Sequence, residues 1–190
     1  MKLFTSQCFV VVAGFFVNQN EGGVKNMNCL IVYCSSHGTT EKAVRFLSES
    51  LKGEVLAVDL KREKATFDLA KFNTVIIGGS IHAGNIQRKI KQFIKNNYEV
   101  LLEKEIGLFL CCMRDGQTAI EQFNNAFPQE LRKNSAAMGL FGGEYLLSGM
   151  NFLEKQIVKK VSGATIDQSN LDYEAIKEFA AKLNTISSLV

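Results

Sequence analysis

Residues 29–34 form the first strongly apolar stretch of the predicted domain, and hydroxyl-bearing residues cluster directly after it. Six residues follow that stretch, and four of them carry hydroxyls around a single glycine: Ser35, Ser36, His37, Gly38, Thr39 and Thr40. A helix that begins here leaves backbone N–H groups without partners at the positive end of its dipole. Such N–H groups, with nearby hydroxyls, can bind a phosphate. The pattern predicts a phosphate-binding turn; the alternative is an ordinary strand-to-helix turn capped by Thr39 or Thr40.

The turn differs from the two best-known phosphate loops. A dinucleotide-binding loop needs three spaced glycines, and a Walker loop needs Gly-Lys followed by Ser or Thr. This turn has one glycine and no lysine. We therefore expect a monophosphate that is held by neutral donors.

The elements around this turn form an alternating pattern. Apolar runs predict five strands, and amphipathic stretches predict helices between them, with two more helices near the end of the chain. The strands are expected at 29–34, 54–59, 72–79, 106–112 and 136–141, and the last two helices at 152–161 and 171–183, the latter capped by Asn170. This order is typical of an α/β fold whose parallel sheet is covered by helices on both faces.

Ligands of such sheets bind at the carboxyl ends of the strands. Glycines and small polar residues gather in the loops expected there, at 78–85, 112–116 and 142–145. The two histidines, His37 and His82, fall in two of these loops, but they lack the carboxylates or thiolates of a metal site. We therefore predict histidines that pack beside a phosphate or a ring, and no metal. No Ser-His-acid order indicates hydrolysis, and catalytic residues stay unassigned.

Composition narrows the classes of function. The chain has 190 residues, 46% of them hydrophobic, and a net charge of +3, which is too small to indicate a nucleic-acid partner. Its five cysteines are odd in number and form no C-x-x-C pair, which favours a reduced, cytoplasmic protein. Cys111 and Cys112 are adjacent; packing residues are expected there, with a redox pair as the alternative.

The first 26 residues do not match the rest. An apolar run over 8–17 has the length of a signal-peptide core, but no small-x-small cleavage site follows it. Two interpretations stand: a misassigned start, with translation beginning at Met27, or a leader that directs the chain to a membrane. In both, residues 27–190 form the functional domain.

The phosphate-turn residues resemble the flavodoxin family, whose first loop reads roughly Ser/Thr-x-Thr/Ser-x-Gly-x-Thr around the phosphate of FMN. Ser35, His37, Gly38 and Thr40 match that pattern, with His37 where many members carry Thr. The resemblance implies a five-stranded parallel sheet of order 2-1-3-4-5 and FMN as the cofactor. The cofactor-binding residues that it implies beyond the turn are Ser80, Ile81, His82, Ala83, Gly84, Cys112, Met113 and Tyr145.

Within that family the chain is similar to the menaquinone-dependent protoporphyrinogen oxidase branch. The matching segments are 77–84, 142–145, 159–165 and the pair Asp172-Tyr173. As in that branch, residues 145–161 are inserted before the last helix and join apolar side chains to lysines. This insertion is an extra packed helix in one interpretation, and a peripheral surface for a membrane quinone or an anionic porphyrin in the other. The 113–135 loop departs from the branch, because it has no excess of basic residues and no tryptophan.

The resemblance implies two functions. The first is an FMN-dependent oxidoreductase of haem biosynthesis that dehydrogenates protoporphyrinogen IX and passes the electrons to a quinone. The second is an electron carrier that has no substrate of its own and exchanges electrons with a partner protein. Because carrier flavodoxins are strongly acidic, the balanced charge of this chain favours the enzyme.

Overall fold

The computed structural model describes residues 27–64, 66–82, 84–145 and 167–187, together with 153, 156, 159 and 160. Residues 1–26, on which two interpretations stand, lie outside this part of the chain, and so do most residues of the membrane or porphyrin surface predicted over 145–161.

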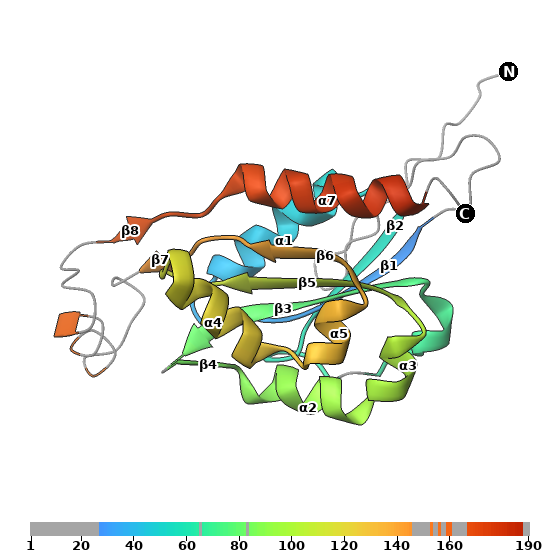
Figure 1. Cartoon of the computed structure of the whole chain (residues 1–190), viewed down its shortest axis with the longest axis horizontal. Helices are drawn as coiled ribbons and strands as arrows, with labels where there is room; N and C mark the ends of the chain where they lie inside the picture. Colours follow the sequence, from blue (N-terminus) through green and yellow to red (C-terminus); the bar gives the residue numbers. More distant parts are fainter. Residues whose placement is uncertain are drawn as a thin grey trace, which may run out of the picture.

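Five parallel strands form the centre of the fold (Figure 1). They are β1 (Asn28–Cys34), β2 (Glu54–Asp59), β3 (Thr74–His82), β5 (Glu105–Cys111) and β6 (Ser135–Leu140), in the spatial order β2-β1-β3-β5-β6. This confirms the predicted order 2-1-3-4-5. A short strand, β4 (Asn85–Ile86), adds an antiparallel pairing to the end of β3.

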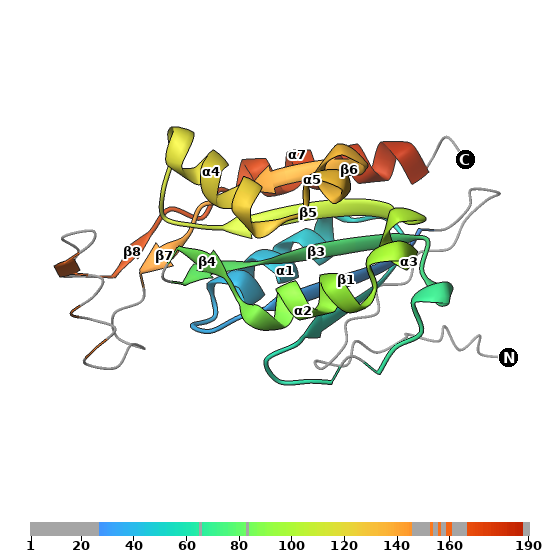
Figure 2. The same ribbon diagram turned by 60° about the horizontal axis from the view of Figure 1, so that its bottom comes forward.

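Helices cover both faces of this sheet, as Figure 2 shows from a second side. One face carries α1 (Thr39–Ser50) and α7 (Tyr173–Ser187). The other carries α2 (Arg88–Asn96), α3 (Tyr98–Leu102), α4 (Gly116–Ala126) and α5 (Gln129–Lys133), and a 3₁₀ turn, η1 (Leu69–Lys71), precedes β3.

The alternation of side chains along the strands creates the two helix-covered cores. In β1, Leu30 and Val32 face the core under α2 and α4, whereas Cys29 and Ile31 face the core under α1 and α7. All four side chains are fully buried. Because successive side chains of a strand point to opposite faces, an apolar run is required where both faces are covered. This explains why the central strands are apolar without a break.

The end of β3 and the cap of the last helix differ from the sequence-based expectation. β3 continues to His82 and turns back into β4, with Ile81 opposite Ile86, so residues expected in a loop extend the sheet. At the last helix, the cap is Asp172, whose carboxylate accepts a hydrogen bond from Ala175 N at 2.9 Å. The prediction of Asn170 as the cap is therefore wrong, because a capping side chain lies directly before the first helical residue.

The residues that flank the 146–167 segment form an antiparallel pair of two-residue strands, β7 (Glu144–Tyr145) and β8 (Gln168–Ser169). Figure 1 places this pair beyond the carboxyl ends of β5 and β6, the edge at which α1 also begins.

Candidate functional site

The turn between β1 and α1 gathers backbone N–H groups around one point. Gly38 is the N-cap of α1 and has a left-handed φ of 95°. The Ser35 hydroxyl oxygen accepts hydrogen bonds from Gly38 N at 3.2 Å and from Glu41 N at 3.4 Å. Two amides therefore point at the same oxygen, which lies inside the turn at the positive end of a 12-residue helix.

This turn has room for a ligand. A methyl group added at Gly38 would meet no atom within 4 Å, and the glycine itself has no side chain with which to cap α1. Ser36 and His37 are half-buried on the same turn. Converging amides, open space above a glycine and a long helix behind it are what an anion such as a phosphate monoester requires.

The two threonines of the predicted turn are oriented differently. Thr39 and Thr40 are buried at the start of α1. Thr40 makes a side-chain hydrogen bond to Cys111, and Thr39 makes one to Glu144. Both hydroxyls thus connect the turn to neighbouring elements, and neither threonine is the N-cap, which is Gly38.

The loop after β3 is held to the end of β1 by Gln87. Its side-chain amide donates to Cys34 O at 3.0 Å and to the Ser80 hydroxyl at 2.7 Å. Its carbonyl oxygen accepts from Ser80 N at 3.0 Å. Through these bonds Gln87, which the sequence analysis did not single out, fixes the two loops relative to each other.

The two histidines come together, as their positions at strand ends predict. The rings of His37 and His82 lie 6.0 Å apart between centroids, and His82 Nε2 is 3.1 Å from the Ser80 hydroxyl. Ile81 is half-buried, Gly84 is exposed, and Ala83 is outside the described residues. The loops after β1 and β3 therefore form one surface at the carboxyl edge of the sheet.

The loops after β5 and β6 pack against each other. Cys112 N donates to Gly142 O at 2.7 Å, and a methyl group at Gly143 would lie 2.9 Å from the carbonyl carbon of Cys112. Met113 is half-buried beside them. Tyr145 follows in β7, where only its backbone is described, so the expectation that its ring covers the cofactor stays a prediction.

Asp59, at the end of β2, holds the turn between β1 and α1 from the side. Its Oδ1 accepts from Ser35 N at 3.3 Å and from Lys61 N at 2.9 Å. The Lys61 ammonium in turn donates to Ser36 O at 3.1 Å. The sequence analysis missed both residues; the available signal was that β2 and β1 were expected as neighbours, so their ends had to meet.

Glu144 is a buried carboxylate that joins α1 to the β7–β8 pair. It accepts from the Ser169 hydroxyl at 2.6 Å and from Lys42 Nζ at 2.9 Å. Burial would raise the pKa of Glu144, but the hydrogen bonds from Ser169, Lys42 and Thr39 outweigh it, so the pKa is lowered. Glu144 is therefore ionised at neutral pH.

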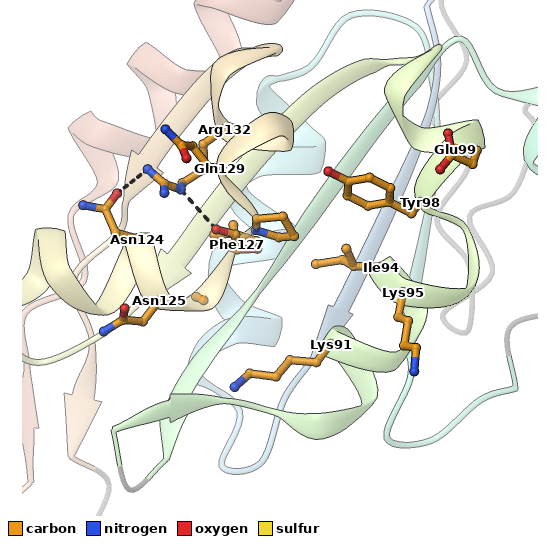
Figure 3. A pocket seen from close by; sticks show the side chains of 12 residues that line it. Lys91, Ile94, Lys95, Tyr98, Glu99, Asn124, Asn125, Phe127, Gln129 and Arg132 are labelled. Atoms are coloured by element: carbon orange, nitrogen blue, oxygen red, sulfur yellow. Dashed lines mark hydrogen bonds between the residues drawn. The ribbon is translucent and has the colours of Figure 1, made fainter.

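The surface formed by the described residues has one hollow beside these loops and another away from them. One, of about 560 Å³, begins at Gly38 and runs along α1 between Lys42, Glu144 and Tyr173. The other, of about 840 Å³, lies between α2–α3 and α4–α5, and Figure 3 shows Tyr98 on one wall and Arg132 on the other. The second shares no lining residue with the predicted cofactor-binding loops.

Among the described residues, no group of three His, Cys, Asp or Glu side chains could hold a metal ion. In the same part of the chain, no helix is long and apolar enough to cross a membrane.

Comparison with known proteins identifies this arrangement. A family model described as "Flavodoxin domain" matches residues 30–172. Among solved structures, an oxidised flavodoxin from Bacillus cereus superposes with a TM-score of 0.52 at 15% identity, covering 83% of this chain and 97% of that one. Homologous flavodoxin domains bind FMN as their cofactor. No curated protein matches the chain.

Two larger proteins share the fold. The flavodiiron core of Flv1 from Synechocystis has a TM-score of 0.51 at 18% identity, and 85% of this chain is covered. Rubredoxin:oxygen oxidoreductase from Desulfovibrio gigas has a TM-score of 0.53 at 16% identity, with 87% covered. The chain spans only 37% of the length of each, and at these identities the likeness concerns the fold alone.

Proposed function

This chain belongs to the flavodoxin domain family, and on that basis we propose that it is an FMN-dependent electron-transfer protein that exchanges electrons with a redox partner. The observation that carries the proposal is the turn at 35–40, where the amides of Gly38 and Glu41 converge on the Ser35 hydroxyl at the start of α1, beside an N-cap glycine that has no side chain. FMN is a phosphate monoester, and this turn has the donors and the space that its phosphate needs.

The chain's own residues would bind and orient the cofactor. Backbone N–H groups of the turn and the hydroxyls of Ser35 and Ser36 would hold the phosphate, with the Ser35 hydroxyl donating its own hydrogen while it accepts from Gly38 N and Glu41 N. The ring would lie beside Ile81, His82 and Met113, with Tyr145 as its cover. Bound FMN supplies one- and two-electron redox chemistry, and the protein sets how readily its electrons are given up.

A second candidate is dehydrogenation of a porphyrinogen with a quinone as acceptor. The observation in its favour is the insertion at 146–167, whose two ends meet in the β7–β8 pair beside the loops after β5 and β6. An insertion at that edge would lie next to a bound ring, where a substrate or a quinone would have to approach. The carrier has the broader support, because it needs only the flavodoxin domain itself.

An absorption titration with FMN tests the binding site. The purified chain should show a flavin band that resists dialysis. Ser36→Asp should weaken FMN binding by at least about tenfold, because its carboxylate repels the phosphate. Ser36→Asn is the matched control, since asparagine has nearly the same shape as aspartate but no charge. A colourless protein that does not bind FMN would overturn the proposed site.

A turnover assay separates the two functions. The FMN-loaded chain is mixed with protoporphyrinogen IX and a menaquinone analogue, and porphyrin fluorescence is followed. A carrier produces no more porphyrin than free FMN at the same concentration. Protein-dependent turnover that disappears when residues 146–167 are replaced by a short Gly-Ser linker would establish the enzyme instead.

A further inference from the structure

Lys61 contacts the phosphate turn from the neighbouring strand. It lies two residues beyond the end of β2, and its ammonium donates to Ser36 O at 3.1 Å. β1 and β2 are parallel, with Tyr33 opposite Asp59, so the residues that follow each strand meet at the same edge. The contact therefore results from the register of the two strands.

The carbonyl that Lys61 contacts belongs to the same peptide unit as His37 N–H. In a trans peptide the C=O and N–H groups point in opposite directions, and the described residues contain no cis peptide. An ammonium at Ser36 O thus holds His37 N–H pointing away from the β2 side of the turn. A cation at the oxygen also polarises the peptide, which makes its N–H a stronger donor.

We propose that Lys61 is a positioning residue for the FMN phosphate: it fixes the orientation of the Ser36–His37 peptide and places a positive charge beside the turn. The inference rests on the proposed location of the phosphate at 35–40. It adds a charged residue to the neutral donors that the sequence predicts.

The charges around the turn show why a cation is needed there. The Asp59 carboxylate is buried directly behind Ser35, where its negative charge would repel a phosphate. Glu41, at the start of α1, is neutralised by a bidentate pair with Arg62, whose Nε also lies 3.7 Å from Asp59. Lys61 then adds a further positive charge at the turn itself.

A second ammonium supports the loop that carries Lys61. Lys89, in α2, donates to Leu60 O at 2.5 Å and to Lys61 O at 3.4 Å. Burial and the Asp59 carboxylate raise the pKa of the Cys34 thiol, whereas the ammonium groups of Lys89 and Lys61 lower it. The fields of both cations therefore reach the end of β1, where the turn begins.

The test compares two ligands that differ only in the phosphate. Dissociation constants for FMN and for riboflavin are measured by fluorescence quenching with the full-length chain, Lys61→Met, Lys61→Arg and Lys64→Met. Lys64 lies in the same exposed loop, so its substitution controls for the loss of one positive charge. Each titration is repeated at about 20 mM and about 500 mM salt, because screening weakens the effect of an exposed charge.

Lys61→Met should weaken FMN binding on the order of tenfold and leave riboflavin binding within about twofold, since only FMN carries the phosphate. Lys61→Arg should restore most of the affinity, Lys64→Met should change little, and the wild-type preference for FMN should fall at high salt. An unchanged FMN-to-riboflavin ratio in Lys61→Met, or an equal loss of both flavins, would overturn the role of Lys61. A failure of the proposed function would be distinct, because the wild-type chain would then bind neither flavin.

Discussion

The Lys42 ammonium lies 2.9 Å from the Glu144 carboxylate and so joins the first turn of α1 to β7. The Glu144 side chain is only 3% exposed, whereas the Lys42 side chain is 48% exposed. A carboxylate inside the protein is therefore paired with a cation at the protein surface. Ser169 of β8 donates to the same carboxylate oxygen. One buried acid therefore ties both flanks of the 146–167 segment to the helix that begins at the phosphate turn.

Glu144→Gln should lower the free energy of unfolding by about 1–2 kcal/mol at pH 7, because a neutral amide replaces an ionised acceptor of three hydrogen bonds. The pKa of Glu144 is lowered in the folded protein, so its stabilising effect is present above the ordinary value of 4.5 and is lost as the pH falls through the folded-state value. The difference between wild type and variant should therefore shrink between pH 7 and pH 3.

Urea denaturation at the two pH values measures this difference. Glu174→Gln is the matched control, because Glu174 pairs with Lys177 at the surface, where both side chains are more than half exposed. It should change the stability by less than about 0.5 kcal/mol. A Glu144→Gln penalty that stays constant with pH would show that ionisation of Glu144 does not stabilise the fold.

Gly38→Ala should cost about 1–2 kcal/mol of stability and also weaken FMN binding. Gly38 has a φ of 95°, which L-residues rarely adopt, and a methyl group there would meet no atom within 4 Å. The cost is therefore backbone strain alone, and relief of that strain would move the amides of the turn. Gly116→Ala is the control, since its φ is 52° and its surroundings are equally open. We expect a similar loss of stability in both variants, by thermal unfolding, and weaker FMN binding only in Gly38→Ala.

The fold could be predicted from the sequence because its signals are local. The apolar run at 29–34 and the glycine-centred turn at 35–40 each describe a single segment, and both lie where expected. The contacts of Asp59 and Lys61 with the turn join residues 24 and 25 positions apart, and they depend on the register of two parallel strands. No sequence pattern in the turn at 35–40 or around Asp59 and Lys61 indicates these contacts.

The end of β3 was missed for a related reason. Its last residues, Ser80 to His82, follow two glycines and include two polar side chains, which is typical of a loop, but they pair with β4 and with Gln87. Tertiary hydrogen bonds there outweigh the weak strand propensity of the segment.

Gln87→Leu should loosen the site and destabilise the fold by about 1–3 kcal/mol. Leucine has a similar size but would leave Cys34 O and Ser80 N without the hydrogen bonds that the glutamine supplies, at a position that is partly buried. Because these bonds hold the loops after β1 and β3 together, the affinity for riboflavin should fall along with that for FMN. Gln92→Leu, at an exposed position of α2, is the control and should leave both affinities unchanged. Unaltered riboflavin binding in Gln87→Leu would show that Gln87 does not position the ring.

Cys111 should resist alkylation in the folded protein. Burial raises the pKa of its thiol to about 12, although the hydrogen bond from Thr40 lowers it in part. Burial likewise raises the pKa of Cys112, and both cysteines are free thiols. Since the thiolate is the reactive form, almost none is present at pH 8, and the buried sulfur is also hard to reach. Mass spectrometry after iodoacetamide treatment should find both residues unmodified at pH 8 and modified once the chain is unfolded in urea. A Cys111–Cys112 disulfide formed under mild oxidation of the folded protein would instead favour the redox pair, and with it a thiol-based electron path beside the flavin site.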